Sequence, residues 1–434
     1  MKKLHILVGL ALAAGSIGAA QALAVDFSGY ARGGYGVNTN GGRQTCFNIK
    51  GQRNVETHYR LGDECDYTLE TNFNSTLAKN ADGSEWHVNF MLKNWRAWNM
   101  TANSDNGMGT QGPTTDFAQA YAYGQNLPIL ANGTIWAGRR YYNRVQLGIN
   151  DHFLQNDDGD GFGVDNINLG AGIKLNAGIV TDELNGNTGN YDMMQKFIVS
   201  VTDIPTFASS KLRVHLKVHS QTKDDQRSYN PATGVTTTTQ TASRKGGYSL
   251  LFLHETPNLL NGTLSAGLRF SKHISGNGGN DNNYQDASGN TVYGKSALLF
   301  VQQSGNFGHT GYDVVSEFKS TKYDGTSAKD RWFSLGGRLD TQIYGPLRGI
   351  AELGYDTVKR SNAITSNNTY NFTHLTLAAA FNAGDDAGSR PTVRLYYTYG
   401  KWNTAVKDAL IEDQKVYGGK TNGSAIGAQW EAWW

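Results

Sequence analysis

The chain ends in Ile426-Gly427-Ala428-Gln429-Trp430-Glu431-Ala432-Trp433-Trp434, a stretch that alternates in character from one residue to the next. Every second residue from Ile426 to Trp434 is apolar, so these side chains would share one face of an extended strand. An apolar strand at a chain terminus exposes unpaired edge groups, unless the sheet closes into a barrel and removes its edges. The stretch therefore favours a closed β-barrel whose apolar face meets lipid.

The same two-residue period recurs along the rest of the chain. Residues 211–219, 263–271 and 393–399 each place apolar side chains on one face of a strand and polar or charged side chains on the other. Between such segments lie tracts rich in Gly, Asn, Asp, Ser and Thr, which are typical of loops and turns. The sequence therefore predicts an all-β protein with many antiparallel strands.

Alternation alone fits both a soluble β-sandwich and a transmembrane barrel, because the apolar face is the core in one and meets lipid in the other. Aromatic pairs such as Tyr141-Tyr142, Tyr396-Tyr397 and Trp433-Trp434 are typical of the girdles at membrane interfaces, and they favour the barrel. Past the first 24 residues, no apolar run in the sequence reaches the length of a membrane-spanning helix. We therefore expect a closed antiparallel transmembrane β-barrel.

Residues 1–24 have the features of a secretory signal peptide, with Lys2 and Lys3, an apolar stretch and the small-x-small triplet Ala22-Leu23-Ala24. An N-terminal membrane anchor is the alternative. We take residues 25–434 as one barrel domain of 410 residues. At about 22 to 26 residues per strand and connection, this length gives about 16 to 18 strands.

The exported part contains the two cysteines of the chain, Cys46 and Cys65, and an oxidising compartment favours a disulfide between them. Two free thiols are the alternative. Without Lys2 and Lys3, the chain carries 37 basic and 37 acidic residues. Because the net charge is then close to zero, we do not expect nucleic acid as a partner.

No complete catalytic or metal-binding motif is found in the sequence. His254-Glu255 begins like a zinc-protease motif, but Asn258 stands where the second histidine belongs. Residues 156–161 begin like a calcium loop, but Ile167 stands at the position of the closing acid. We therefore expect no enzyme, no metal and no cofactor, although sequence cannot place the paired carboxylates of a glycosidase.

A barrel of this size encloses water, so its inward face should carry the function. Sugars suit such a lining, because each ring has apolar C–H faces for aromatic side chains and hydroxyls for charged groups. Alternation puts Tyr30 and Arg32 on one face of the first strand, and Trp433 on the same face as Glu431. The alternative for Tyr30 is an interfacial girdle.

Four blocks of the sequence resemble the maltoporin family of sugar-specific porins. They are residues 25–32 (VDFSGYAR), 59–65 (YRLGDEC), 134–144 (TIWAGRRYYNR) and 427–434 (GAQWEAWW), and the match extends over residues 25–434. The resemblance implies an 18-stranded barrel, a homotrimer in the outer membrane of a Gram-negative bacterium, and a third loop folded inward as a constriction. It also implies a ladder of aromatic rings, the greasy slide, flanked by ionic residues.

The resemblance assigns roles to positions of this sequence. Tyr30 and Trp433 match slide positions, and Phe153 stands where the family has a constriction tyrosine. The positions that match the ionic track are Arg32, Arg60, Glu70, Arg144 and Asp151. These eight residues are the candidates for lining the channel and binding sugar.

Other positions of the family pattern have changed. Thr68 and Gly388 replace slide aromatics, Ala118 replaces an arginine, and Asn156 replaces a constriction acid. Tyr67, next to Thr68, has the wrong parity to face the lumen. Since each stacked ring contributes on the order of 1 kcal/mol, we expect weaker oligosaccharide binding than the full pattern provides.

The function expected from the sequence is diffusion of maltose, maltodextrins or related sugars down their gradient through an outer-membrane carbohydrate porin. The expected partners are oligosaccharide, outer-membrane lipid and further copies of the chain in a homotrimer. One alternative is a general diffusion porin or a porin for another oligosaccharide. The alternative from a different class is a secreted β-rich protein that binds or hydrolyses carbohydrate.

Overall fold

The computed structural model describes residues 25–44, 46–47, 49, 59–97, 114–182, 194–220, 222–274, 282–285, 291–361, 369–408 and 416–434. The predicted signal peptide, residues 1–24, lies outside the described residues. Strands make up nearly all of the described secondary structure, with α1 (Thr404–Asp408) and the 3-10 turn η1 (Pro128–Leu130) as short helical elements. No helix in these ranges is long and apolar enough to cross a bilayer.

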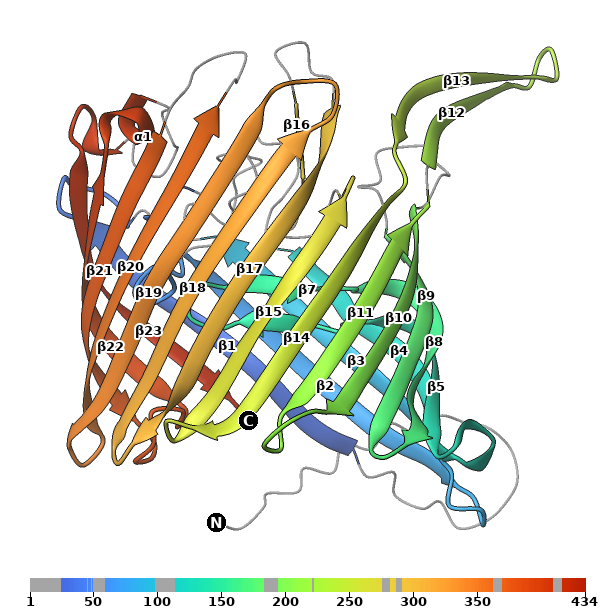
Figure 1. The fold of residues 1–434 in the computed structure, drawn as a ribbon, viewed down its shortest axis with the longest axis horizontal. Helices are drawn as coiled ribbons and strands as arrows, with labels where there is room; N and C mark the ends of the chain where they lie inside the picture. Colours follow the sequence, from blue (N-terminus) through green and yellow to red (C-terminus); the bar gives the residue numbers. More distant parts are fainter. Residues whose placement is uncertain are drawn as a thin grey trace.

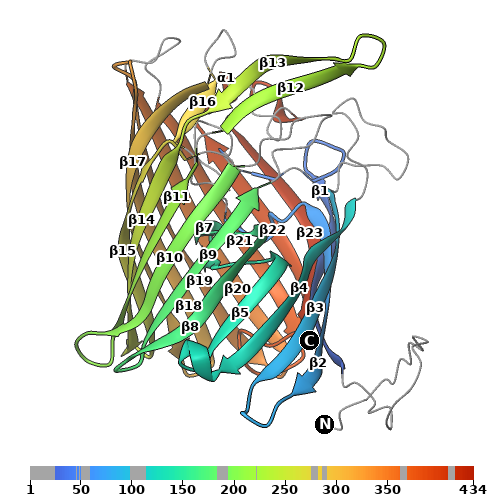
Figure 2. The same ribbon diagram turned by 90° about the vertical axis from the view of Figure 1, so that its right-hand side faces the viewer.

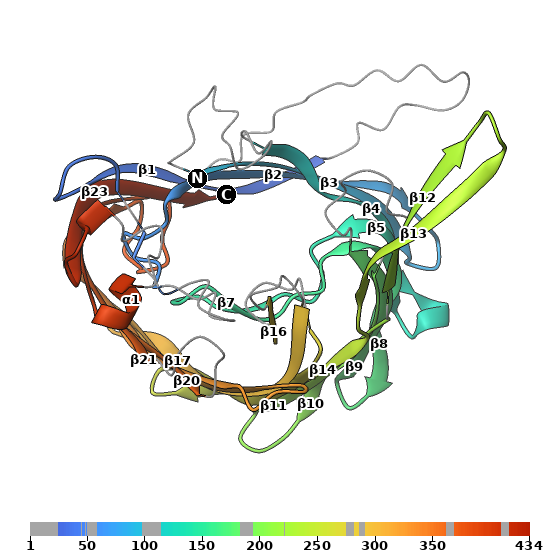
Figure 3. The same cartoon turned by 90° about the horizontal axis from the view of Figure 1, so that it is seen from above.

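The main sheet in the described ranges has 19 strands, of which β16 (Asn283–Gln285) pairs only with β17. The other eighteen form a closed antiparallel ring in which each strand pairs with the next and the last with the first (Figure 3). The strands of the ring are β1 (Val25–Asn38), β2 (Asp66–Lys79), β3 (Glu85–Ala97), β4 (Thr114–Leu127), β5 (Gly133–Arg140), β8 (Gly159–Gly170), β9 (Ile173–Asp182), β10 (Met194–Pro205), β11 (Lys211–His219), β14 (Gly247–Leu259), β15 (Gly262–Lys272), β17 (Thr291–Phe307), β18 (Thr310–Tyr323), β19 (Lys329–Tyr344), β20 (Leu347–Ser361), β21 (Thr369–Asn382), β22 (Thr392–Trp402) and β23 (Asn422–Trp433). The closed all-β barrel predicted from the sequence is confirmed.

The ring closes between the first and last strands. β23 pairs with β1 from Tyr30 opposite Trp433 to Asn38 opposite Ala425. Backbone hydrogen bonds of 3.1 and 3.2 Å between Gly29 and Trp434 extend this pairing to the last residue. Because β23 also pairs with β22, both of its edges are occupied. The apolar stretch that ends the chain is therefore a barrel strand, as its alternation predicts.

Apolar side chains are exposed on the outside of the barrel and polar side chains are buried inside it, which is the reverse of a soluble protein. On β21, Leu375, Leu377 and Phe381 point outward and are exposed, whereas His374 and Thr376 are buried on the inner face. The same alternation continues around the ring and leaves a belt of exposed apolar side chains on the outside. Such a belt is solvated by lipid rather than by water, so the barrel spans a membrane.

The expectation that the tyrosine pairs lie in interfacial girdles is wrong for three of the four residues. Tyr396 is buried on the inner face and only Tyr397 is exposed outside, because neighbours in a strand point to opposite faces. Tyr141 and Tyr142 follow β5, and their hydroxyls donate hydrogen bonds of 2.9 and 2.8 Å to carboxylates of the inner wall.

The two ends of the barrel differ. Short turns, such as residues 80–84 between β2 and β3, lie at one end, where β1 also begins and β23 ends (Figure 1). The hairpin of β12 (Thr222–Asn230) and β13 (Val235–Arg244) and the helix α1 lie at the opposite end (Figures 1 and 2). We call these the turn end and the loop end. In outer-membrane barrels, short turns face the periplasm and long loops face the outside.

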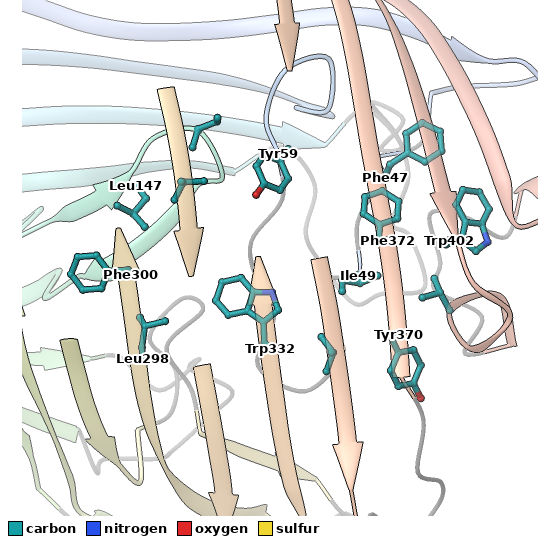
Figure 4. Close-up of a cluster of buried hydrophobic side chains, with 14 of the residues drawn as sticks. Phe47, Ile49, Tyr59, Leu147, Leu298, Phe300, Trp332, Tyr370, Phe372 and Trp402 are labelled. Atoms are coloured by element: carbon teal, nitrogen blue, oxygen red, sulfur yellow. The ribbon is translucent and has the colours of Figure 1, made fainter. Parts of the chain in front are cut away.

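The described parts of two connections lie inside the ring. One joins β1 to β2, and the other joins β5 to β8 and contains β6 (Val145–Leu147) and β7 (His152–Gln155), with β7 visible inside the ring in Figure 3. We call residues 141–158 the inner segment. Apolar side chains of both connections pack against the wall in one cluster, which joins Tyr59 and Leu147 to Phe300 and Trp332 of the strands (Figure 4). A hydrophobic core therefore lies within the barrel.

The β1–β2 connection is held by a disulfide and by close packing. Cys46 and Cys65 are bonded, with their Cα atoms 6.0 Å apart. The ring of Tyr59 lies directly on the backbone of Gly336 and Gly354, where an added Cβ would come within 2.1 and 2.0 Å of the ring. Any larger residue at these two positions would push the connection away from the wall.

Candidate functional site

The strand register places the candidate residues in two rows on the inner face of β23, β1, β2 and β3. One row, called here the Trp433 row, consists of Trp433, Tyr30, Glu70 and Lys93. The other row, called here the Glu431 row, consists of Glu431, Arg32, Thr68 and Trp95. Directly opposed residues of antiparallel strands have Cβ atoms about 5 Å apart, so each row is a continuous line of side chains.

Glu431 on β23 is the centre of a cluster of charged groups at one end of the Glu431 row. Its carboxylate accepts hydrogen bonds from Tyr30 Oη at 3.0 Å, Arg390 Nε at 2.9 Å and Arg394 Nη2 at 2.8 Å. The guanidinium of Arg390 lies 4.2 Å from the centroid of the Trp433 ring, which is 47% exposed. Trp433 therefore presents an open aromatic surface beside charged groups that are already held in place.

Arg32 joins the wall to the β1–β2 connection, which in turn contacts the inner segment through Arg60. Its Nε and Nη2 each donate a 2.7 Å hydrogen bond to the carboxylate of Asp66, in the bidentate geometry that makes such pairs strong. Glu64, on the β1–β2 connection, forms ion pairs with both Arg32 and Arg60. Arg60 Nη1 in turn lies 3.4 Å from the carbonyl oxygen of Gly148 on the inner segment.

The start of the inner segment carries a second group of candidates. Tyr141 Oη donates a 2.9 Å hydrogen bond to Glu70, whose carboxylate lies 3.5 Å from Lys93 Nζ. Arg144 is paired with Asp158 at 2.9 Å, and its guanidinium carbon lies 3.2 Å from the centroid of the Tyr141 ring. The same carbon lies 5.5 Å from the centroid of Phe153. Aromatic and ionic side chains thus lie next to one another here, as they do on the wall.

The contacts join seven of the eight sequence candidates in two groups, around Arg32 and around Arg144. Asp151 also lies on the inner segment, with a positive φ of 57°, and accepts a hydrogen bond from Gln146 of the same segment. No described hydrogen bond or ion pair joins Asp151 to the two rows, but its charge acts on Arg32 of the Glu431 row.

The opposite wall of the barrel holds the inner segment in place. Glu317 on β18 accepts a 2.5 Å hydrogen bond from Asn150 Nδ2 and also contacts His152 Nδ1. Lys217 and Arg269 donate hydrogen bonds of 3.0 and 2.9 Å to the carbonyl oxygens of Asn156 and Leu154. All three charged side chains of the wall are buried. The segment is therefore fixed to this wall by charged groups that water does not reach.

Asp157 of the inner segment forms an ion pair with Lys217 of the same wall. Burial by itself would raise the pKa of its carboxyl, but Lys217, 3.1 Å away, and His215 hold that pKa below its usual range. The carboxylate therefore stays ionised inside the barrel at neutral pH.

One cluster in the described residues has the composition of a metal site. The sulfurs of Cys46 and Cys65 and a carboxylate oxygen of Asp63 lie within 4.8 Å of one another. The disulfide leaves neither sulfur as a thiolate, the form in which cysteine binds metals. These three residues therefore do not fit a metal ion in the oxidised protein.

Trp95 is a residue of the inner face that the sequence did not identify as a candidate. Thr68 faces Trp95 across β2 and β3, and the indole Nε1 donates a 3.1 Å hydrogen bond to Asp66 on the inner face. The β2–β3 pairing contains a register shift between Thr76 and Ala78, so the alternation of β3 cannot be aligned with that of β2 from sequence. Tyr67 points outward, as its parity predicts.

Gly388 lies at a hollow of about 540 Å³ near the turn end, lined among others by Arg338, Arg390 and Arg394. A Cβ added at Gly388 would have no other atom within 4 Å. The position that carries a slide tryptophan in the family pattern is therefore open space beside charged groups in this protein.

Comparison with known proteins gives one family and a set of barrels. The model of the LamB porin family matches residues 25–434. Among solved structures, OpdK of Pseudomonas aeruginosa is similar with a TM-score of 0.50 at 9% identity, over 95% of this chain and 99% of that chain. OmpT of Vibrio cholerae, in its trimer form, gives a TM-score of 0.40 at 11% identity, over 95% of this chain and 100% of that chain.

The similarity to OpdK at such low identity concerns the fold alone, and it agrees with the closed barrel described above. The family match is of a different kind, because it covers nearly the whole sequence, including the strands that carry both rows of the site. On the sequence match and the barrel together, the chain belongs to the LamB porin family.

Proposed function

We propose that the protein is a carbohydrate porin of a Gram-negative outer membrane, which lets maltose, maltodextrins or related sugars diffuse down their gradient. As a LamB-family porin, the chain is a channel of the outer membrane and not an enzyme, so the secreted carbohydrate-binding or hydrolytic alternative is set aside. The observation that carries the sugar preference is the exposed ring of Trp433 beside Glu431, Arg390 and Tyr30.

The proposed mechanism uses two properties of a sugar ring. Its apolar C–H face can stack on Trp433 and Tyr30, and its hydroxyls can bond to carboxylates and guanidinium groups of the two rows. As the sugar advances by one position, each hydroxyl exchanges one charged partner for the next. Because the bond that breaks and the bond that forms are similar, movement along the rows needs little net free energy.

We also propose that the inner segment is the constriction of the channel, with Arg144, Asp151 and Phe153 at its edge. Its bonds to Glu317, Lys217 and Arg269 on one wall support this role, as do the contacts of Tyr141 with Glu70 and of Arg60 with Gly148 on the other side. A segment held at both sides can narrow a pore without collapsing into it.

The protein is further proposed to act as a homotrimer surrounded by outer-membrane lipid. The family resemblance supports the trimer, and the belt of apolar side chains supports contact with lipid or with a neighbouring barrel. Chemical cross-linking of the protein in detergent would test this, because a trimer gives a ladder that ends at three copies.

The test of the sugar preference is the single-channel current of the purified protein in a planar bilayer, titrated with maltotriose, sucrose and several β-linked disaccharides. We expect saturable block by maltotriose. Block by another sugar alone would reassign the substrate, and steady conductance with no block would favour the general diffusion porin, which the changes at Thr68 and Gly388 keep as the second candidate.

A further inference from the structure

Trp95 lies near the loop end of β3 and is half-buried on the inner face. Its indole Nε1 donates a 3.1 Å hydrogen bond to Asp66 Oδ2, and Asp66 also accepts the two 2.7 Å bonds from Arg32. The hydroxyl of Thr68 lies 3.4 Å from the same carboxylate. The indole is therefore held in one orientation beside an ion pair on the wall.

The position of Trp95 relative to Trp433 follows from the register. Trp433 and Trp95 lie on β23 and β3, which are separated by β1 and β2, and the two rows differ by two residues along the strands. With strands about 4.8 Å apart and a rise of about 3.3 Å per residue, the two Cα atoms are roughly 15 Å apart. A chain of a few sugar rings has this reach, so one oligosaccharide could touch both tryptophans.

The ion pair beside Trp95 has the chemistry that a sugar ring needs next to an aromatic surface. A carboxylate accepts hydrogen bonds from hydroxyls, and a guanidinium donates to their oxygens. Asp66 and Arg32 provide one of each, and an indole provides the apolar surface for the C–H face. The same combination is found around Trp433, where Glu431 and Arg390 flank the ring.

We propose that Trp95, Asp66 and Arg32 form a second sugar subsite on the loop-end side of Trp433, with Trp95 as its stacking surface and pyranose rings as its ligands. This subsite rests on the proposed function. Its aromatic ring comes from β3 and lies opposite Thr68 of β2, which replaces a slide aromatic of the family pattern. The oligosaccharide then meets Trp95 before Trp433 when it enters from the loop end.

A purely structural role for Trp95 makes different predictions. Arg32 already fixes Asp66 through two hydrogen bonds, so the indole N–H is not required to hold the carboxylate. Trp95→Phe keeps an aromatic surface and removes the N–H, whereas Trp95→Ala removes both. Phe90→Ala, on the same strand but with its side chain exposed on the outer face, is the matched control.

The experiment measures sugar block of single channels for these three variants, for Trp433→Ala and for the wild type, with maltotriose and maltohexaose added to each side in turn. For Trp95→Ala we expect a Kd about five-fold higher and a slower on-rate from the loop end. The Kd of Trp95→Phe should stay within about two-fold of the wild type. Phe90→Ala should match the wild type.

The outcomes separate the subsite from the function. If sugar blocks the wild type and Trp433→Ala weakens the block, but Trp95→Ala does not, the subsite is wrong and the proposed function stands. If Trp95→Phe is as weak as Trp95→Ala, stacking is overturned in favour of the hydrogen bond to Asp66. If neither sugar blocks the wild type, the proposed preference for maltodextrins fails and the subsite fails with it.

Discussion

The two walls of the lumen use charged residues in opposite ways. On the wall of β23, β1, β2 and β3, charged groups lie beside the open ring of Trp433 and the half-buried ring of Trp95. On the wall of β11, β15 and β18, Lys217, Arg269 and Glu317 are buried under the inner segment. Both walls come from the same two-residue alternation. The difference between the open wall and the anchoring wall is therefore whether a segment of the chain covers it.

The largest effect is expected from removing a side chain of the wall that holds the inner segment. Glu317→Ala should free Asn150 and His152 and leave buried polar groups without partners, which costs about 3 kcal/mol. We expect a larger and noisier open-channel current, measured in planar bilayers on protein shown to be a folded barrel. Glu317→Gln keeps an acceptor and should lie between this variant and the wild type. Unchanged conductance and noise would mean that Glu317 is not needed to hold the segment.

Removing the aromatic surface of the other wall should affect sugar rather than architecture. Trp433→Ala should raise the Kd for maltotriose about five- to ten-fold, because one stacked ring is lost. Because the side chain is open to the lumen, the variant should still fold and assemble into the proposed trimer. Its mobility in gels, compared with and without heating, would show this. An unassembled protein would instead make Trp433 a structural residue.

The inner segment, which contains Phe153, lies between the two walls. Phe153→Ala should weaken sugar block about three-fold, since a ring near Arg144 is lost. Open conductance should be equal or larger, because the side chain that is removed takes up space. Both quantities come from the same bilayer recordings. Sugar block equal to that of the wild type would show that this part of the segment is not the constriction.

The smallest expected effect is a gain in affinity for sugar. Gly388→Trp would place a ring in open space beside Arg390, and we expect a Kd for maltotriose about two-fold lower. Gly388→Ala adds no ring and serves as the control, with affinity unchanged. If the tryptophan variant binds sugar no better, then the hollow at the turn end is not on the path of the sugar.

The sequence predicts local features of this protein well and long-range ones poorly. The strand that ends at Trp434 and the parity of Tyr67 and Trp433 follow from alternation, which each strand carries by itself. The position of Trp95 depends on the register between two strands, and a bulge at Thr76 shifts that register. The burial of Tyr396 depends on Gln44, which is far away in the chain. Such contacts have no signal in a single local pattern.

The anchors of the inner segment also bear on how this pore can change over generations. Lys217 and Arg269 bind carbonyl oxygens of Asn156 and Leu154, and Arg60 lies against that of Gly148. Every amino acid has a carbonyl oxygen, so these three contacts do not depend on the side chains of the segment, unlike those of Glu317 with Asn150 and His152. A substitution in the segment can therefore change a side chain while these backbone contacts persist.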